Sequence, residues 1–409
     1  MGIMACCCHS NCDCESQSAS FRSDLPTPAL TSQPSLHSVP SLTSQTHQRQ
    51  SNVSTIHYHC LTTLKGHNSY ASSLTLAGKF LYVGSSDREI RLWDCNPLTL
   101  QLDQEIMNNN IVAVGKGAVK SLVVLADKLF SAHQDHKIRV WKINNEEHDH
   151  HQQKYTRLAT LPTLSDRALK LLFPKNHVQI RRHKKSTWVH HVDTVSALAL
   201  TSDETLLYSV SWDRTIKIWR TSDFKCLESI TNAHDDAINA VALSKDGHVY
   251  SGSTDKKIKA WRKKSGEKKH SLVSTLEKHK SGINALALST DGFVLYSGAC
   301  DRSILVWEKE ESGNMELVGA LRGHTKSILC IAVVSDLVLS GSADKTIRIW
   351  RGIDRNYSCL AVLEGHKGPV KCLTAAIDKN YNHSDATYLV YSGSLDRDIK
   401  VWQIFVPLH

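Results

Sequence analysis

Residues 337–350 read LVLSGSADKTIRIW, and this stretch recurs along the chain in altered form. An apolar run ends in small residues, an aspartate follows, and a tryptophan stands six residues after the aspartate. Between the two, apolar and charged side chains alternate with the period of two that indicates a half-buried strand. The pattern occurs seven times, in the pairs Asp87–Trp93, Asp135–Trp141, Asp213–Trp219, Asp255–Trp261, Asp301–Trp307, Asp344–Trp350 and Asp396–Trp402. It predicts two strands joined by a tight turn that carries the aspartate.

A third strand precedes each of these pairs. In five repeats it is introduced by a histidine followed four residues later by Val or Ile, as in His324 and Ile328. Successive tryptophans lie 42 to 52 residues apart, except for a step of 78 residues between Trp141 and Trp219. A period in the low forties indicates one supersecondary unit per repeat, stacked against its neighbours to bury a continuous core.

These features carry a family resemblance. The Gly-His pairs at 66–67, 323–324 and 365–366, the Ser-Gly-Ser turns and the tryptophan endings resemble those of WD repeats over about residues 59–402. The resemblance implies an all-β fold, a seven-bladed β-propeller with one four-stranded sheet per blade. Residues 161–200 carry a narrower resemblance, to plant WD-repeat proteins of the JINGUBANG type, which have a comparable basic insertion.

The resemblance also implies a hydrogen-bonded chain of His, Ser, Asp and Trp inside each blade. Such a chain satisfies buried polar groups and fixes the turn that carries the aspartate. Five repeats have all four residues, and these structural tetrads are His191, Ser209, Asp213, Trp219; His234, Ser251, Asp255, Trp261; His279, Ser297, Asp301, Trp307; His324, Ser340, Asp344, Trp350; and His366, Ser392, Asp396, Trp402. The first repeat has Val83 in place of the serine, and the second, which reads AVGKGAVKSL at 113–122, lacks the histidine. We expect these two blades to be the weaker ones.

A histidine near a serine and an aspartate also fits a hydrolytic triad. Five copies of one arrangement favour the structural interpretation, because an enzyme needs one active site. The chain shows no glycine-rich phosphate loop and no paired carboxylates for acid–base work. We therefore expect no catalytic residues, no cofactor and no metal site.

The ring closes through a strand that has no blade of its own. The chain ends soon after Trp402, which lies in the third strand of the last repeat, and HCLTTL at 59–64 precedes the first repeat. We expect 59–64 to pair into the seventh blade and remove the open edge between first and last blades. The propeller is then 57–409, with a basic insertion at 147–188.

Residues 1–56 are expected to be a disordered tail without core contacts. Of the forty residues 16–55, twenty are Ser, Thr or Pro, and such a segment cannot bury enough apolar surface to offset the entropy of ordering. The extreme N-terminus offers a lipidation site at Gly2, Cys6, Cys7 and Cys8. A soft metal bound by the five cysteines of 6–14, or no specific role, are the alternatives.

Composition bounds location. No apolar run approaches the roughly 18 residues that cross a bilayer, and the first ten residues lack the apolar core of a secretion signal. The scattered cysteines indicate a reducing compartment, cytoplasmic or nuclear, with peripheral contact to the plasma membrane if the N-terminus is acylated. The net charge of +9 favours acidic partners.

One basic residue follows each motif aspartate. These positions hold Arg88, His136, Arg214, Lys256, Arg302, Lys345 and Arg397. In a propeller the seven turns emerge on one face around the channel, so we expect these charges to sum and bind acidic or phosphorylated segments of a partner protein. Two further basic stretches, 181–185 and 256–270, leave RNA or anionic lipid open as a ligand. The run EEHDHH at 146–151 is a solvated loop or, alternatively, a metal site.

The sequence thus favours a monomeric, non-enzymatic interaction scaffold or regulatory adapter in signalling or transcription, of plant origin, for which nucleic acid is not the expected partner. The first alternative is a substrate receptor of a cullin-type ubiquitin ligase. In that subset a repeat ends Trp-Asp-x-Arg, whereas here only Trp93 is followed by aspartate and Asn96 occupies the arginine position. The second alternative is an anionic-lipid or RNA binder.

Overall fold

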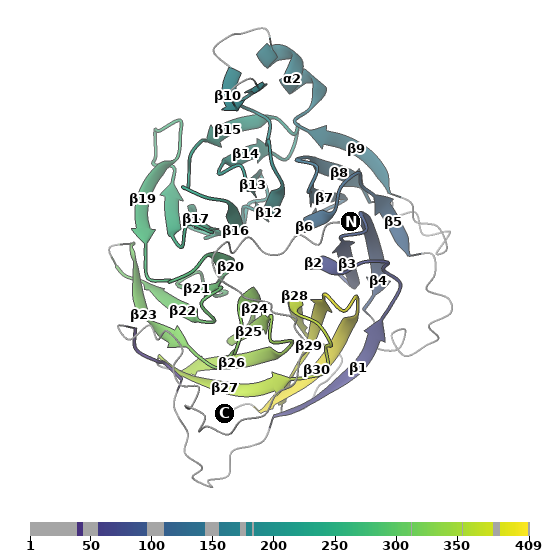
Figure 1. Ribbon diagram of the computed structural model, residues 1–409, viewed down its shortest axis with the longest axis vertical. Coiled ribbons are helices and arrows are strands. Elements are labelled where there is room, and N and C mark those ends of the chain that lie inside the picture. The colour runs from purple at the N-terminus through teal and green to yellow at the C-terminus, as the bar shows by residue number, and fades with distance from the viewer. Residues whose placement is uncertain are drawn as a thin grey trace, which may run out of the picture. The chain divides into compact units, whose positions relative to one another are not determined.

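The computed structural model describes residues 39–43, 56–95, 110–143, 155–171, 177–181, 184–311, 313–353, 355–378 and 385–407. Seven four-stranded antiparallel sheets surround a central axis as the blades of a propeller (Figure 1). The seven-bladed β-propeller expected from the repeats is confirmed. No helix in the described ranges is both long enough and apolar enough to cross a membrane.

Within each blade the strands run from the axis outwards. Blades 1 to 3 contain β2 (Ala71–Ala77), β3 (Phe80–Ser85), β4 (Glu89–Asp94), β5 (Ile111–Val114); β6 (Val119–Leu125), β7 (Lys128–His133), β8 (Ile138–Lys142), β9 (Thr156–Leu161); and β12 (Val195–Leu200), β13 (Leu206–Ser211), β14 (Ile216–Arg220), β15 (Cys226–Ile230). Blades 4 and 5 contain β16 (Ile238–Leu243), β17 (His248–Ser253), β18 (Ile258–Arg262), β19 (Ser271–Leu276); and β20 (Ile283–Leu288), β21 (Val294–Ala299), β22 (Ile304–Lys309), β23 (Met315–Leu321). Blades 6 and 7 contain β24 (Ile328–Val334), β25 (Leu337–Ser342), β26 (Ile347–Ile353), β27 (Asn356–Leu363); and β28 (Val370–Ile377), β29 (Asp385–Ser394), β30 (Ile399–Pro407), β1 (His57–Leu64).

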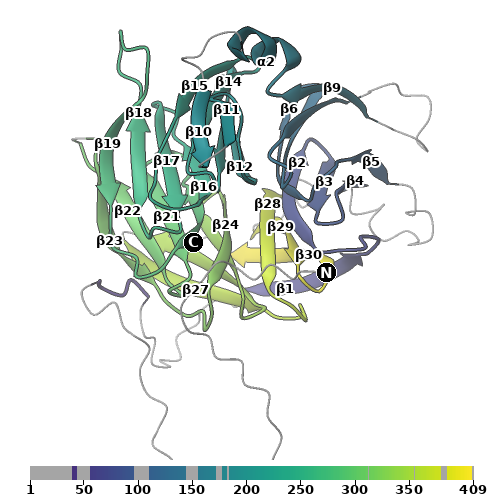
Figure 2. The same cartoon turned by 45° about the horizontal axis from the view of Figure 1, so that its top comes forward.

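The inner strands form a closed ring. The first strand of each blade contacts that of the next blade, and β28 contacts β2 (Figure 2). The buried clusters lie between adjacent blades, so that the cluster around Trp261, for example, joins side chains of blades 3 and 4. Because each blade buries its faces against its neighbours, removing one blade exposes two apolar surfaces.

The N-terminal strand closes this ring as expected. Strand β1 pairs antiparallel with β30, from His57 opposite Phe405 to Leu64 opposite Ile399. The prediction that residues 59–64 supply the outer strand of blade 7 is confirmed.

The range 147–188 is not a single insertion. It contains β9, the outer strand of blade 2, and only then helix α2 (Leu164–Leu171) and the hairpin of β10 (His177–Arg181) and β11 (Lys184–Thr187). The hydroxyl of Thr163 accepts a hydrogen bond from the backbone N–H of Asp166 at 3.3 Å, as an N-cap does, and the Asp166 carboxylate accepts one from the N–H of Cys226 at 2.9 Å. This ties the start of the helix to the outer strand of blade 3.

The tail also differs from the sequence expectation at one place. Residues 39–43 lie against the outer strands of blades 5 and 6, with Val39 only 5% exposed. The expectation of a tail without core contacts is wrong for these five residues. The proposed lipidation site lies outside the described residues, as does most of the tail.

Candidate functional site

The turn after the second strand of each blade has the same backbone conformation. In all seven turns the residue after the motif aspartate has a positive φ, between 65° and 78°. Glycine and asparagine adopt this left-handed region most readily, whereas other residues do so at a cost. The backbone therefore does not select for the basic side chains that stand there: Arg88, His136, Arg214, Lys256, Arg302, Lys345 and Arg397.

These seven side chains are available to a ligand. Arg302 is half-buried and the other six are exposed. Among the described residues, none of the seven forms an ion pair with a carboxylate. Every blade is the same antiparallel meander around one axis, so the seven turns lie at one face of the ring. We call this surface the turn face.

The polar chain behind each turn fixes its position. In blade 5, His279 Nδ1 lies 2.9 Å from Asp301 Oδ2 and His279 Nε2 lies 2.8 Å from Ser297 Oγ, which also accepts a hydrogen bond of 2.8 Å from Trp307 Nε1. The Asp301 carboxylate accepts three further hydrogen bonds, from the backbone N–H groups of Lys280 and Ser303 and from the Ser303 hydroxyl. The chain thus clamps the turn to the link that enters the blade.

The same geometry holds in all five tetrads. The structure brings the four residues of each together in blades 3 to 7, with His–Asp distances of 2.8 to 3.1 Å, His–Ser distances of 2.7 to 2.8 Å and Trp–Ser distances of 2.8 to 2.9 Å. The five serines are completely buried, so their hydroxyls face no solvent from which a substrate could approach.

Titration follows from this burial. Burial raises the pKa of Asp301, but the hydrogen bonds from His279 and Ser303 contribute to outweighing it, and the pKa falls to about 2. Burial lowers the pKa of His191 from its ordinary value, in spite of the neighbouring Asp213. A neutral histidine donates from Nδ1 to the carboxylate and accepts at Nε2 from the serine hydroxyl, which is the arrangement that the distances allow.

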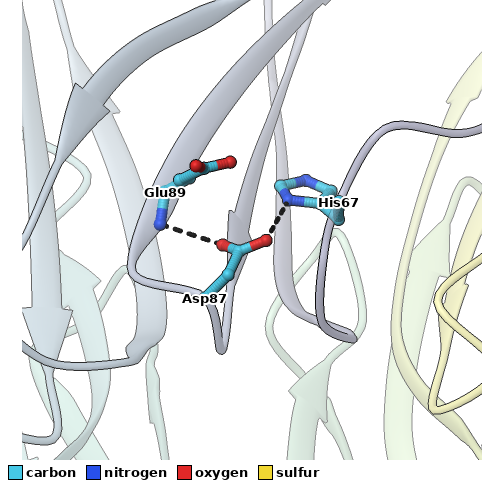
Figure 3. Close-up of side chains that lie close together, drawn as sticks. All are labelled: His67, Asp87 and Glu89. Carbon is cyan, nitrogen blue, oxygen red and sulfur yellow. Dashed lines mark hydrogen bonds and ion pairs between the residues drawn. The ribbon is translucent and has the colours of Figure 1, made fainter.

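Blade 1 has only part of this chain. His67 Nδ1 lies 3.1 Å from Asp87 Oδ2, but Val83 replaces the serine and His67 Nε2 is buried without a hydrogen-bond partner among the described residues. Glu89 lies beside the pair, and its backbone N–H donates to Asp87 Oδ1 at 3.0 Å (Figure 3).

His67, Asp87 and Glu89 are also the one described group whose three potential metal-ligating atoms lie within 4.8 Å of one another. The three groups are already engaged in hydrogen bonds, because His67 Nδ1 pairs with Asp87 and one oxygen of Glu89 accepts hydrogen bonds of 2.8 and 3.1 Å from the Arg91 guanidinium. The donor set therefore fits an internal polar network better than it fits a cation.

Blade 2 supplies its histidine from another strand. His133, at the end of β7, lies 2.8 Å from Ser131 Oγ, which accepts a hydrogen bond of 2.8 Å from Trp141 Nε1. Its Nδ1 lies 2.9 Å from the carbonyl oxygen of Gly117. Gly115 occupies the motif position of the histidine, and a Cβ there would meet His133 Cε1 at 2.4 Å. The imidazole of His133 on β7 therefore fills the space of the missing motif histidine. The spacing of the repeats did not reveal this exchange.

The turn of blade 2 is held by an arginine instead. Both oxygens of Asp135 accept hydrogen bonds from the guanidinium of Arg139, one of them at 3.0 Å. Burial raises the pKa of Asp135, but these hydrogen bonds outweigh it and lower that pKa below its ordinary value. The turn that carries His136 is thus fixed by different residues in the same place.

Sequence reasoning missed further residues on the turn face. The links that enter the blades touch the motif aspartates, so they lie on this face, and four of them carry an exposed lysine after the histidine position: Lys116, Lys280, Lys326 and Lys367. Among the described residues that follow the histidine position of each link, exposed carboxylates stand in blades 3 and 4, at Asp193, Asp235 and Asp236, while Glu277 and Glu364 are exposed just before the histidines of blades 5 and 7. The part of each link that follows the histidine is therefore basic, without an exposed carboxylate, in blades 5 to 7.

An aromatic side chain adds to this surface. Trp212 directly precedes Asp213 in the turn of blade 3 and is half-buried, with the Lys120 ammonium 5.7 Å from its ring centroid. Tryptophan is enriched where protein interfaces concentrate their binding energy. The signal was in the sequence, because six of the seven turns have a smaller residue there.

The other basic stretch lies on the rim. In blade 4, residues 262–269, which connect β18 to β19, are exposed throughout. Lys257 pairs with Glu277 at 3.0 Å, and Lys259 donates to the carbonyl oxygen of Ala233 at 2.8 Å, so these two serve the fold. The side chains of 181–185, the EEHDHH run and the N-terminal cysteines lie outside the described residues.

Comparisons with known proteins agree with this geometry. A profile of the WD domain, G-beta repeat, matches more than half of the chain, in residues 58–94, 182–220, 224–262, 270–308, 315–351 and 357–403. Blade 2, with its displaced histidine, is absent from these matches.

Several curated proteins are similar over part of their length. They include the zinc finger CCCH domain-containing protein 62 of Arabidopsis thaliana, 30% identical over 163 residues (39% of this chain, 37% of that protein). Cell division control protein 4 of Candida albicans is 33% identical over 123 residues (27% and 17%), and the WD repeat-containing protein srw1 of Schizosaccharomyces pombe is 28% identical over 170 residues (40% and 29%). The chain spans less than two fifths of each of these relatives.

Proposed function

Because this chain belongs to the WD-repeat family, whose members generally act as interaction scaffolds or adapters, we propose that it is a non-enzymatic adapter that binds an acidic or phosphorylated segment of a partner protein across the turn face. The observation that carries the proposal is the basic residue at the same turn position of all seven blades. A basic residue stands in a left-handed conformation that would suit glycine better, and it does so at every turn.

Charge sums over this surface. Seven turns converge around one axis although they are far apart in sequence, and the lysines of the links add to them. Because the carboxylates at 193, 235 and 236 lie over blades 3 and 4, we expect the segment of the partner to bind over blades 5 to 7. Trp212 gives the partner an apolar contact at the opposite side of the same face.

Only sequence resemblance indicates the process in which the adapter acts. The likeness of residues 161–200 to plant WD-repeat regulators supports a place in signalling or transcription. The absence of the Trp-Asp-x-Arg ending, with Asn96 in the arginine position, argues against a cullin-type receptor.

Charge reversal with capture of bound proteins tests the proposal. The face variant carries Arg302→Glu, Lys345→Glu and Arg397→Glu, and the matched rim variant carries Lys263→Glu, Lys264→Glu and Lys268→Glu. Tagged wild type and both variants are used to purify partner proteins from the source cells. Mass spectrometry then identifies the partner proteins.

We expect the face variant to lose the specific partners and the rim variant to keep them, with circular dichroism spectra equal to that of the wild type in both. Loss in the rim variant with retention in the face variant would contradict the proposal. It would favour the anionic-lipid or RNA binder, whose ligand would contact residues 262–269.

A further inference from the structure

A short piece of the N-terminal tail lies between two blades at the rim of the propeller. Residues 39–43, the short purple segment beside β23 in Figure 2, form parallel bridges to Ala320 of β23 and to Tyr357 of β27. The backbone of Leu42 joins both strands: its N–H donates to the carbonyl oxygen of Ala320 at 2.9 Å and its carbonyl oxygen accepts from the N–H of Tyr357 at 3.2 Å. The N–H of Ala320 donates to the carbonyl oxygen of Pro40 at 2.9 Å.

Side chains of the segment are also held. Val39 is 5% exposed, and its carbonyl oxygen accepts a hydrogen bond of 2.9 Å from the Arg322 guanidinium. Leu42 packs against the buried cluster shared by blades 5 and 6. Ser41 is exposed, and its hydroxyl lies 2.8 Å from that of Thr43. Val39 and Leu42 are thus held against the propeller, whereas Pro40 and Ser41 between them face solvent.

A glycine opens the room for this segment. Gly319 lies in the middle of β23, and the three atoms nearest to a Cβ added there, at 2.5 to 2.8 Å, all belong to Leu42 and Pro40. Glycine inside a strand costs stability and often marks the close approach of another backbone. The outer strands of blades 2, 3, 4, 6 and 7 carry a side chain at the position paired with the residue before the tryptophan: Ala159, Glu228, Ser274, Ala361 and Thr62. The glycine is therefore placed where the segment needs it.

The sequence of the bound segment occurs three times in the tail, with small changes. Pro-Ser-Leu-Thr-Ser at 40–44 is preceded by Pro-Ser-Leu-His-Ser at 34–38 and by Pro-Ala-Leu-Thr-Ser at 28–32, each six residues apart. A tether that merely fastens the tail has no need of copies. Repeated copies of one short motif are what a recognition site selects.

We propose that the cleft between β23 and β27 is a peptide-binding site for extended Pro-Ser-Leu-Thr segments, that residues 39–43 are its resident ligand in cis, and that the same motif in another protein binds there by displacing them. Main-chain hydrogen bonds to the two strand edges supply affinity. The contact of Leu42 with the cluster and the absence of a side chain at Gly319 supply specificity.

Competition within the chain sets the affinity for a ligand in trans. Residues 44–55 join the bound segment to Ile56, and the copy at 34–38 has a linker only six residues longer. Loop closure alone therefore disfavours that copy less than about two-fold. A free peptide must compete with this high local concentration, so removing the cis segment raises its apparent affinity.

Fluorescence anisotropy on the full chain tests the site with a labelled peptide of residues 37–45, HSVPSLTSQ. The Leu42→Asp variant, which also carries Leu30→Asp and Leu36→Asp because the copies at 28–32 and 34–38 would otherwise take the site, places a charge against the apolar cluster and releases the segment, while the propeller side of the cleft stays unchanged. We expect saturable binding to Leu42→Asp, with an affinity at least about ten-fold higher than for the wild type. The same peptide with Leu42→Asp should not bind.

The groove-side control is Leu42→Asp combined with Gly319→Val. The added side chain fills the space of the ligand, and no positive φ at Gly319 makes it strained, so the fold is retained and peptide binding falls at least about ten-fold. Equal binding to both variants, or no difference between the two peptides, overturns the proposal.

Hydrogen exchange separates a binding site from a fixed tie. The amide of Leu42 should exchange slowly in the wild type and rapidly in Gly319→Val. Slow exchange in the wild type together with no binding of the peptide to Leu42→Asp means that the segment is a permanent part of the fold, and it also overturns the proposal. Since the turn face is not involved, its variants leave every one of these results unchanged.

Discussion

The incomplete polar chain of blade 1 can be completed by one substitution, Val83→Thr. Val83 is fully buried, and His67 Nε2 has no partner among the described residues. A threonine hydroxyl at this position would stand where Ser209 or Ser392 stands in its own blade, 2.8 Å from Nε2 of the histidine. The remaining methyl group keeps its contacts in the cluster that Val83 shares with Trp93.

The expected change in stability follows from one unfavourable and two favourable contributions. Replacing a buried methyl group by a hydroxyl loses about 1 kcal/mol of apolar transfer free energy. Pairing the buried His67 Nε2 removes a penalty of about 1–3 kcal/mol, and the hydrogen bond from Trp93 Nε1 adds about 1 kcal/mol if it forms as in the other blades. We expect Val83→Thr to stabilise the propeller by about 1–3 kcal/mol, which raises the midpoint of thermal unfolding by roughly 1–2 °C for each kcal/mol.

The matched control makes the opposite change. Ser392→Val gives blade 7 the residue of blade 1 and leaves Nε2 of His366 and Nε1 of Trp402 without their partner. It should destabilise by about 2–4 kcal/mol. Thermal unfolding followed by tryptophan fluorescence measures both variants. If Val83→Thr lowers the midpoint as Ser392→Val does, the hydrogen-bond account of the tetrads is refuted.

Three further predictions concern closure, acid and packing. Deleting residues 1–56 should lower the unfolding midpoint only slightly, whereas deleting 1–66 removes β1 and should lower it strongly; equal midpoints would contradict the closure of blade 7. Burial, and after it the neighbouring Arg139, lowers the pKa of His133 to about 4. The unfolded chain therefore binds the proton first as the pH falls, and the stability present above about pH 6.5 should fall by about 2 kcal/mol by pH 5. Urea unfolding that does not depend on pH over this range would contradict this prediction. Trp307→Ala should lower the free energy of unfolding by about 3–5 kcal/mol, and Trp188→Ala should lower it less, because the first side chain is 3% exposed and the second only partly buried. If urea unfolding shows Trp188→Ala to be the more destabilising, the register assigned to blade 3 is wrong.

The regular parts of the molecule could be predicted because each repeat carries the same residues for the same structural roles. The aspartate fixes a turn, the tryptophan fills the space between blades, and strand alternation does the rest, so the spacing from Asp344 to Trp350 suffices for a blade. Closure by 59–64 followed from a blade that lacked one strand. The turn positions followed for the same reason, since one residue after each aspartate has one backbone conformation.

What could not be predicted depends on contacts between residues far apart in sequence. His133 fills a volume that belongs to Gly115 in the repeat, and the exchange is visible only when both are seen in one place. The docking of 39–43 rests on Gly319 and on two strand edges, none of which shows in the composition of the tail. Polar, proline-rich composition predicts the absence of a core, but it does not exclude a five-residue segment that binds to one.

Binding of a defined acidic peptide to the turn face tests the central claim most directly. A fluorescein-labelled peptide of ten glutamates is titrated with wild type, with Arg302→Glu/Lys345→Glu/Arg397→Glu and with Lys263→Glu/Lys264→Glu/Lys268→Glu, at about 50 and 200 mM salt. We expect the first triple variant to lose at least about ten-fold in affinity, the second to stay within about two-fold, and binding to weaken as salt rises. If the peptide binds the first variant as tightly as the wild type, or if only the second variant loses it, the turn face is not the recognition surface for acidic segments.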